Sequence, residues 1–147
     1  MKIKVLFLLL SLGIVSAGEL TAPSFQLMNQ NGENIELDSF KGKKVILEWT
    51  NHDCPFVQRH YETSNMQSLQ EKYTKQGVVW LSIISSAEGK QGYISPDEAI
   101  QLTDSRGANP THVLFDTSGE VGKCIRQKLH LTCISSMKIK NCSTKAL

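Results

Sequence analysis

The chain has 147 residues, with 16 Lys and Arg against 14 Asp and Glu, and its formal net charge is +2. This length suits a single domain that can bury a core without disulfides. With 40% hydrophobic and 20% charged residues, the composition excludes a disordered, collagen-like or polytopic membrane protein. The small net charge predicts no nucleic-acid partner.

The first 17 residues have the pattern of a cleavable export signal. Lys2 and Lys4 precede an apolar run over 5–15, and small residues end the segment at Ala17. The run is shorter than the roughly 20 residues that span a bilayer. We therefore expect cleavage after Ala17 and a periplasmic or secreted mature protein without stable membrane insertion. An uncleaved N-terminal anchor is the alternative.

Residues 18–123 alternate between strand and helix patterns. Period-two alternation and buried apolar runs indicate strands, and apolar residues at helical spacing indicate helices. The expected elements are a hairpin of strands at 25–28 and 35–37, a strand at 43–50, a helix at 55–76, a strand at 78–84, a helix at 96–106 and a strand at 112–115. This order predicts an α/β sheet with helices packed on it.

Two helix starts are marked by proline. Pro55 suits the first helical position, where the missing N–H is not needed. Ser95 precedes Pro96 and has Glu98 three residues later, which predicts a capping box.

Cys54 lies at the junction of a buried strand and the helix that Pro55 opens. In open α/β sheets, reactive groups gather beyond the carboxyl ends of the strands. The positive end of a helix and its free N–H groups favour the thiolate, which is the reactive form. We therefore predict that Cys54 is a reactive thiol. The alternative is a small buried hydrophobic residue.

Other residues near this junction have weaker signals. His52, Cys54 and His60 offer a soft-metal set, for example for copper, but their spacing matches no strong metal signature. We therefore predict neither a metal nor another cofactor. Arg106, at the end of the second helix, could approach an anionic intermediate, and a solvated helix-end arginine is the alternative.

Residues 22–123 resemble the redoxin branch of the thioredoxin-like superfamily, the group of alkyl hydroperoxide reductase and thiol-specific antioxidant. Within it, the run Trp-Thr-Asn-x-x-Cys-Pro-Phe-Val is similar to that of an exported bacterial subgroup. The segments that carry the resemblance are 22–25, 37–43, 48–57, 79–82 and 92–93. The resemblance implies a thioredoxin-like α/β fold and maps the family's reactive cysteine onto Cys54.

Two departures from the family pattern narrow the chemistry. A thioredoxin-type pair has a second Cys three residues after the first, where this chain has Val57. A peroxiredoxin has Thr or Ser three residues before its reactive Cys and Pro four residues earlier still, where this chain has Asn51 and Leu47. A single-cysteine oxidoreductase remains, in which a peroxide or disulfide substrate oxidises Cys54 and an external thiol restores it. Thr50, Asn51 and Arg106 are further candidates, for polarising a bound oxidant. The alternatives are a copper- or client-binding module and an inactive truncated remnant.

Residues 124–147 do not continue this pattern. They contain three of the four cysteines and five basic but no acidic residues. A reading frame shifted by two bases can instead encode H-T-A-K-T-T-P-H-M-Y-I-I-N-E-D-K-K-L-F-Y-K-G-A, which has the Thr-Pro turn and the two strands that the resemblance implies. We therefore predict a frameshift between Gly122 and Cys124, with the last strands missing or replaced by an aberrant, disordered tail. A basic, cysteine-bearing interaction peptide is the alternative.

The net charge of the expected domain differs from that of the whole chain. Residues 18–123 have nine basic and fourteen acidic residues, a net charge of −5, and Cys54 as their one cysteine. The sequence thus predicts an acidic exported domain with a single thiol.

Resequencing the gene across the codons for residues 118–147 tests the frameshift. We expect a one- or two-base discrepancy near the codons for Gly122 to Cys124. An uninterrupted frame identical to the present one would contradict the frameshift.

Overall fold

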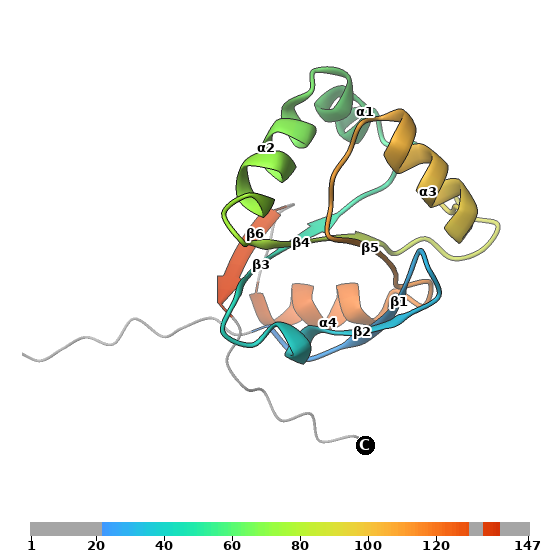
Figure 1. Ribbon diagram of the computed structural model, residues 1–147. Helices are drawn as coiled ribbons and strands as arrows, with labels where there is room; N and C mark the ends of the chain where they lie inside the picture. The colour runs from blue at the N-terminus through green and yellow to red at the C-terminus, as the bar shows by residue number, and fades with distance from the viewer. Residues whose placement is uncertain (1–21, 130–133, 139–147) are drawn as a thin grey trace, which may run out of the picture.

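The computed structural model describes residues 22–129 and 134–138 (Figure 1). The expected export signal over 1–17 lies outside these residues, as do 130–133 and 139–147 of the expected tail. Within the described part, no helix has both the length and the apolar character that a membrane crossing requires.

One six-stranded sheet runs through the molecule, in the order β2-β1-β5-β4-β3-β6. Strands β3, β4 and β5 are parallel, whereas β1 pairs antiparallel with β2 and β5, and β6 pairs antiparallel with β3. The strands are β1 (Gln26–Asn29), β2 (Asn34–Glu36), β3 (Lys44–Trp49), β4 (Val79–Ile84), β5 (His112–Phe115) and β6 (Ile134–Lys138).

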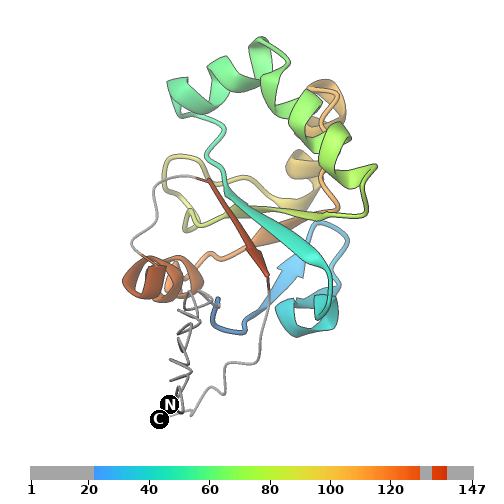
Figure 2. The same cartoon turned by 90° about the vertical axis from the view of Figure 1, so that its left-hand side faces the viewer.

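Helices cover both faces of the sheet. Helices α1, α2 and α3 lie on one face, and α4 and the short 3-10 helix η1 lie on the other, as the two views show (Figures 1 and 2). Their bounds are η1 (Leu37–Phe40), α1 (Pro55–Glu62), α2 (Asn65–Thr74), α3 (Pro96–Ser105) and α4 (Glu120–Leu129).

The buried core follows the alternation of the central strands. On β3, Val45 and Leu47 belong to the main core cluster with Leu81 and Ile83 of β4. Ile46 lies between them in sequence and packs with α1 and α2 residues instead. Because successive side chains of a strand point to opposite faces, a strand that is buried on both sides is largely apolar, as the sequence pattern of 43–50 and 78–84 indicated. Glu48 of β3 and Ser82 of β4 are the buried polar exceptions.

Most of the expected elements are confirmed. The hairpin forms between β1 and β2, and the strands expected at 43–50, 78–84 and 112–115 are β3, β4 and β5. Helix α3 begins with the predicted capping box, in which Glu98 N–H donates to Ser95 Oγ and the Glu98 carboxylate accepts from Ser95 N–H. The expected α/β class, a sheet with helices packed on it, is likewise confirmed.

The single helix expected over 55–76 is wrong. The chain forms two helices, α1 and α2, which meet at Ser64, a residue with a left-handed φ of 57°. The apolar positions explain the break, since the step from Tyr61 to Met66 is five residues and does not fit a period of 3.6. Two helices allow both side chains to be buried in the same cluster.

The expectation of a tail without helix or strand does not hold for the described residues. Helix α4 runs through the expected boundary at Lys123 and continues to Leu129, and β6 pairs with β3 along five residue positions. Val121, Ile125 and Leu129 have helical spacing. The expected boundary at Lys123 separates Val121 from the other two residues, so neither side of the boundary contains the whole pattern. Strand β3 is therefore not an edge strand.

A buried carboxylate connects the sheet to two of its helices. Glu48 of β3 is only 3% exposed. Its Oε1 accepts from the Tyr61 hydroxyl of α1 at 3.1 Å, and its Oε2 accepts from the Trp80 indole at 2.7 Å, the Ser82 hydroxyl at 2.8 Å and Gln70 Nε2 of α2 at 3.3 Å. Burial raises the pKa of the Tyr61 hydroxyl, and the charge of Glu48 raises it further.

Glu48→Gln tests this network. The amide is close in shape, but it places an NH₂ group among donors, so we expect the free energy of unfolding to fall by about 2–3 kcal/mol. Urea denaturation with an unchanged m-value measures it. Glu36→Gln on the exposed face of β2 is the matched control, with an expected change within about 0.5 kcal/mol. Equal stabilities for the two variants would contradict the role of Glu48.

Candidate functional site

Cys54 is the N-cap residue of α1 and lies beyond the carboxyl end of β3. Its N–H donates to Asn51 O at 3.1 Å, and its carbonyl accepts from Gln58 N–H at 2.9 Å, the first bond of the helix. The residue is partly exposed, and Phe56 beside it is 79% exposed. The thiol is therefore accessible at the positive end of α1.

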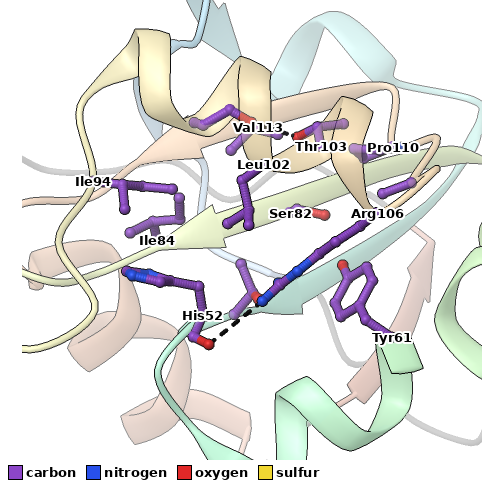
Figure 3. Close-up of a pocket in the computed structure, with 13 residues that line it drawn as sticks. His52, Tyr61, Ser82, Ile84, Ile94, Leu102, Thr103, Arg106, Pro110 and Val113 are labelled. Carbon is purple, nitrogen blue, oxygen red and sulfur yellow. Dashed lines mark hydrogen bonds between the residues drawn. The ribbon is translucent and has the colours of Figure 1, made fainter. Parts of the chain in front are cut away.

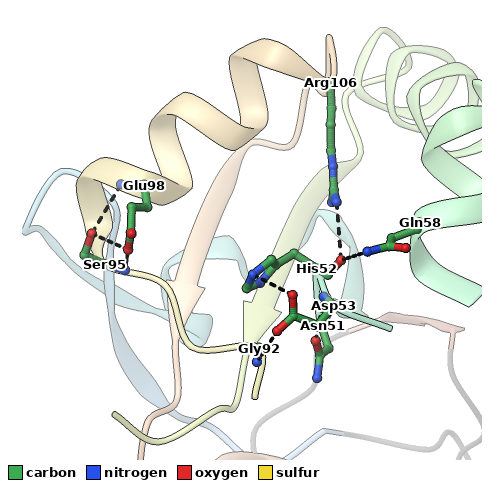
Figure 4. Close-up of polar contacts among 8 residues, drawn as sticks. All are labelled: Asn51, His52, Asp53, Gln58, Gly92, Ser95, Glu98 and Arg106. Carbon is green, nitrogen blue, oxygen red and sulfur yellow. Dashed lines mark hydrogen bonds and ion pairs between the residues drawn. The ribbon is translucent and has the colours of Figure 1, made fainter. Parts of the chain in front are cut away.

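The loop before Cys54 is held by hydrogen bonds within itself and to α1. Asn51 Oδ1 accepts from Asp53 N–H at 2.9 Å, which forms a side-chain turn. Gln58 Nε2 of α1 donates to the His52 carbonyl at 3.0 Å (Figure 4). The position of the thiol is thus fixed by polar contacts on both sides of the turn.

A second loop, between β4 and α3, packs directly on the first. Gly92 N–H donates to Asp53 Oδ2 at 3.0 Å (Figure 4). Gly92 has a φ of 80°, and a Cβ built on it would lie 2.4 Å from the Asn51 Cγ and Oδ1 atoms. The approach of the two loops therefore requires glycine at position 92.

Asp53 also contacts its neighbour in sequence. Its Oδ1 lies 3.1 Å from His52 Nε2. Both oxygens of Asp53 are thus occupied, one by the loop between β4 and α3 and the other by the imidazole. Asp53 therefore acts as a bridge between the two loops.

The predicted site residues occupy different positions. Thr50 N–H donates to Ile83 O at 2.9 Å, which continues the pairing of β3 and β4, and Asn51 is committed to the turn and to Gly92. Arg106 lies over the ring of Tyr61, with Cζ 4.8 Å from the ring centre, and its Nη2 is 3.5 Å from the His52 carbonyl. Thr50, Asn51 and Cys54 share one loop, and Arg106 reaches that loop at His52.

The described part of the chain contains no assembled ligand set for the copper-binding alternative. No three His, Cys, Asp or Glu side chains gather there in a way that could hold a metal. His60 Nδ1 contacts Asn65 Nδ2 at 2.9 Å at the surface of α1. It thus has a partner other than Cys54.

Sequence reasoning missed Glu48, Tyr61 and the contact between Asp53 and Gly92. A glutamate inside an otherwise apolar strand is a readable signal, because buried carboxylates require partners. The contact between Asp53 and Gly92 joins residues far apart in the chain and leaves no local pattern.

The fold defines a class. A parallel β3-β4-β5 core with antiparallel β6, helices on both faces and a cysteine at the N-cap of α1 is a thioredoxin-like α/β domain. The model of the AhpC/TSA family matches residues 19–126, and the chain belongs to this family. The redoxin assignment from the sequence is thereby confirmed.

Several relatives agree with this class. The thiol-disulfide oxidoreductase ResA of Halalkalibacterium halodurans is 29% identical over 123 residues, 75% of this chain and 68% of the relative. An uncharacterised conserved protein of Geobacillus kaustophilus is 26% identical with a TM-score of 0.62, and the match covers 70% of this chain but only 54% of that one. A thiol:disulfide interchange protein DsbE of Chlorobium tepidum, described as putative, is 21% identical with a TM-score of 0.52, over 70% of this chain and 65% of the other, and supports the fold alone.

Gly92→Ala tests the packing of the two loops. The added Cβ overlaps Asn51, so we expect a loss of about 1–3 kcal/mol in the free energy of unfolding and a changed alkylation rate of Cys54. Gly89→Ala is a matched control, because Gly89 also has a positive φ but no atom within 4 Å of a built Cβ.

A rescue separates the overlap from backbone strain. Adding Asn51→Ala to Gly92→Ala removes the overlapping atoms, and we expect it to recover part of the stability. Gly92→Ala and Gly89→Ala variants that behave alike would show that only the left-handed backbone matters.

Proposed function

We propose that the protein is an exported, thiol-dependent oxidoreductase of the redoxin type in which Cys54 is the single redox-active thiol. The observation that carries the proposal is the position of Cys54, partly exposed at the N-cap of α1 in a domain of the AhpC/TSA family. The similarity to a thiol-disulfide oxidoreductase supports the same class of chemistry.

The position that would hold a second active-site cysteine is part of the core. Val57 packs against the cluster that contains Ile46, Tyr61 and Trp80. A dithiol cycle between positions 54 and 57 is therefore not available to this chain, and an external thiol is the proposed reductant.

With a peroxide substrate, the proposed cycle has three steps. The Cys54 thiolate attacks one oxygen of a peroxide, the O–O bond breaks, and the sulfur becomes a sulfenic acid while water or an alcohol leaves after taking up a proton. One molecule of an external thiol then forms a mixed disulfide with Cys54 and releases water, and a second thiol restores Cys54 and leaves as the oxidised disulfide. With a disulfide substrate, the thiolate attacks one sulfur instead, the substrate's S–S bond breaks, its other sulfur leaves as a thiolate, and the mixed disulfide forms directly.

Export and the frameshift complete the proposal. The signal pattern of 1–17 supports export of the domain to an oxidising compartment, where disulfides persist. A restored frame after residue 123 would replace three cysteines, so that Cys54 would be the remaining thiol of the mature domain.

A single-thiol variant tests the role of Cys54. Serine replaces Cys124, Cys133 and Cys142 in the full chain, which is then treated with hydrogen peroxide and a sulfenic-acid-trapping reagent. We expect trapping at Cys54 by mass spectrometry, and peroxide consumption in the presence of a small thiol. Adding Cys54→Ser should reduce consumption to the uncatalysed rate.

The outcome also separates the alternatives. A folded variant whose Cys54 neither traps as sulfenic acid nor exchanges with an added disulfide contradicts the proposed chemistry. Tight Cu(I) binding by that same unreactive thiol would favour the metal-carrying module, and a chain that fails to fold would favour the inactive remnant.

A further inference from the structure

A small cavity lies under α3, between that helix and the sheet (Figure 3). It has about 420 Å³ of empty space, part of which is open to solvent. Apolar side chains of Ile84, Ile94, Leu102 and Val113 form much of its wall. Cys54 is not among the lining residues, so the cavity is a separate feature beside the thiol's loop.

Arg106 supplies a cation to this cavity. Its guanidinium lies over Tyr61 and makes one long contact, 3.5 Å from Nη2 to the His52 carbonyl. Within the described residues no carboxylate forms an ion pair with it. Because a guanidinium has five N–H donors, most of its hydrogen-bonding capacity remains available.

His52 supplies a second polar atom. Its Nδ1 is buried and has no hydrogen-bond partner among the described residues, whereas Nε2 faces the Asp53 carboxylate. A buried ring nitrogen without a partner is unfavourable, and in the protonated ring Nδ1–H is a donor. No lining residue of the cavity is acidic. The buried Glu48 carboxylate lies behind the wall, where it accepts hydrogen bonds from two lining residues, Tyr61 and Ser82, and these bonds partly offset its charge.

We propose that this cavity binds a small aliphatic carboxylate. Arg106 pairs with the carboxylate, His52 Nδ1–H donates to it, and the apolar wall around Leu102 holds the short chain. The roughly 420 Å³ of empty space, part of it open to solvent, suits a short aliphatic carboxylate. The site does not depend on the proposed redox role of Cys54, although a bound molecule would lie beside its loop.

Butyrate and butyramide test the proposal, because they have nearly the same shape and differ in charge. Each is titrated into the full chain, and binding is followed by saturation-transfer NMR and by the chemical shifts of the His52 and Leu102 signals. We expect saturable butyrate binding that shifts both residues, and butyramide binding weaker by about tenfold or more.

Matched arginine variants identify the cation. Arg106→Gln should weaken butyrate about tenfold or more. Arg59→Gln, the same charge change at an exposed position of α1, should leave it unchanged. Arg106→Lys retains the cation and should bind butyrate better than Arg106→Gln, even if the stacking on Tyr61 is weakened.

Three results would overturn the site. They are the absence of saturable butyrate binding, equal binding of butyrate and butyramide, and equal weakening by Arg59→Gln and Arg106→Gln. The last would indicate attraction by net charge. Loss of Cys54 reactivity with butyrate binding intact would refute the redox proposal alone.

Discussion

The buried Glu48 carboxylate is the contact on which the arrangement of the site depends. It lies in the strand that leads to Cys54, and it accepts hydrogen bonds from α1, α2 and β4. A buried carboxylate is costly unless its lone pairs are occupied, so the network favours one placement of both helices over the sheet. Because Cys54 caps α1, that placement also sets the position of the thiol.

Further polar contacts extend this constraint from Tyr61 to α3. Tyr61 donates to Glu48 and stacks under Arg106, and Gln67 Nε2 donates to the carbonyls of both Tyr61 and Arg106, at 2.8 Å each. On the other side of the thiol, Asp53 holds the loop of Gly92. The loop of Cys54 is therefore supported both by Arg106 and by the loop of Gly92. Thr50 and His52 of this loop also line the cavity under α3. Substitutions at Glu48 or Gly92 should therefore also change the position of the Cys54 thiol.

The sequence predicted those parts of the fold that depend on local pattern. Apolar runs located β3 and β4, and Ser95 and Glu98 located the start of α3, because periodicity and capping are local properties. The break at Ser64 required attention to the phase of the apolar positions. The site was predicted at Cys54 from the strand-to-helix junction, whereas the Asp53–Gly92 contact and the stacking of Arg106 on Tyr61 arise from tertiary packing of distant segments.

The position of β6 bears on the predicted frameshift. In the shifted frame the apolar run M-Y-I-I falls at about residues 132–136, overlapping the start of β6 (Ile134–Lys138). Isoleucine and tyrosine favour strands more than serine does, and the present chain has Ser135 and Ser136 there. A restored frame would therefore provide a better partner for β3 at the same place. The contacts that position Cys54, from Glu48 to Arg106, all precede residue 124, so the chemistry of the thiol can be tested in either frame.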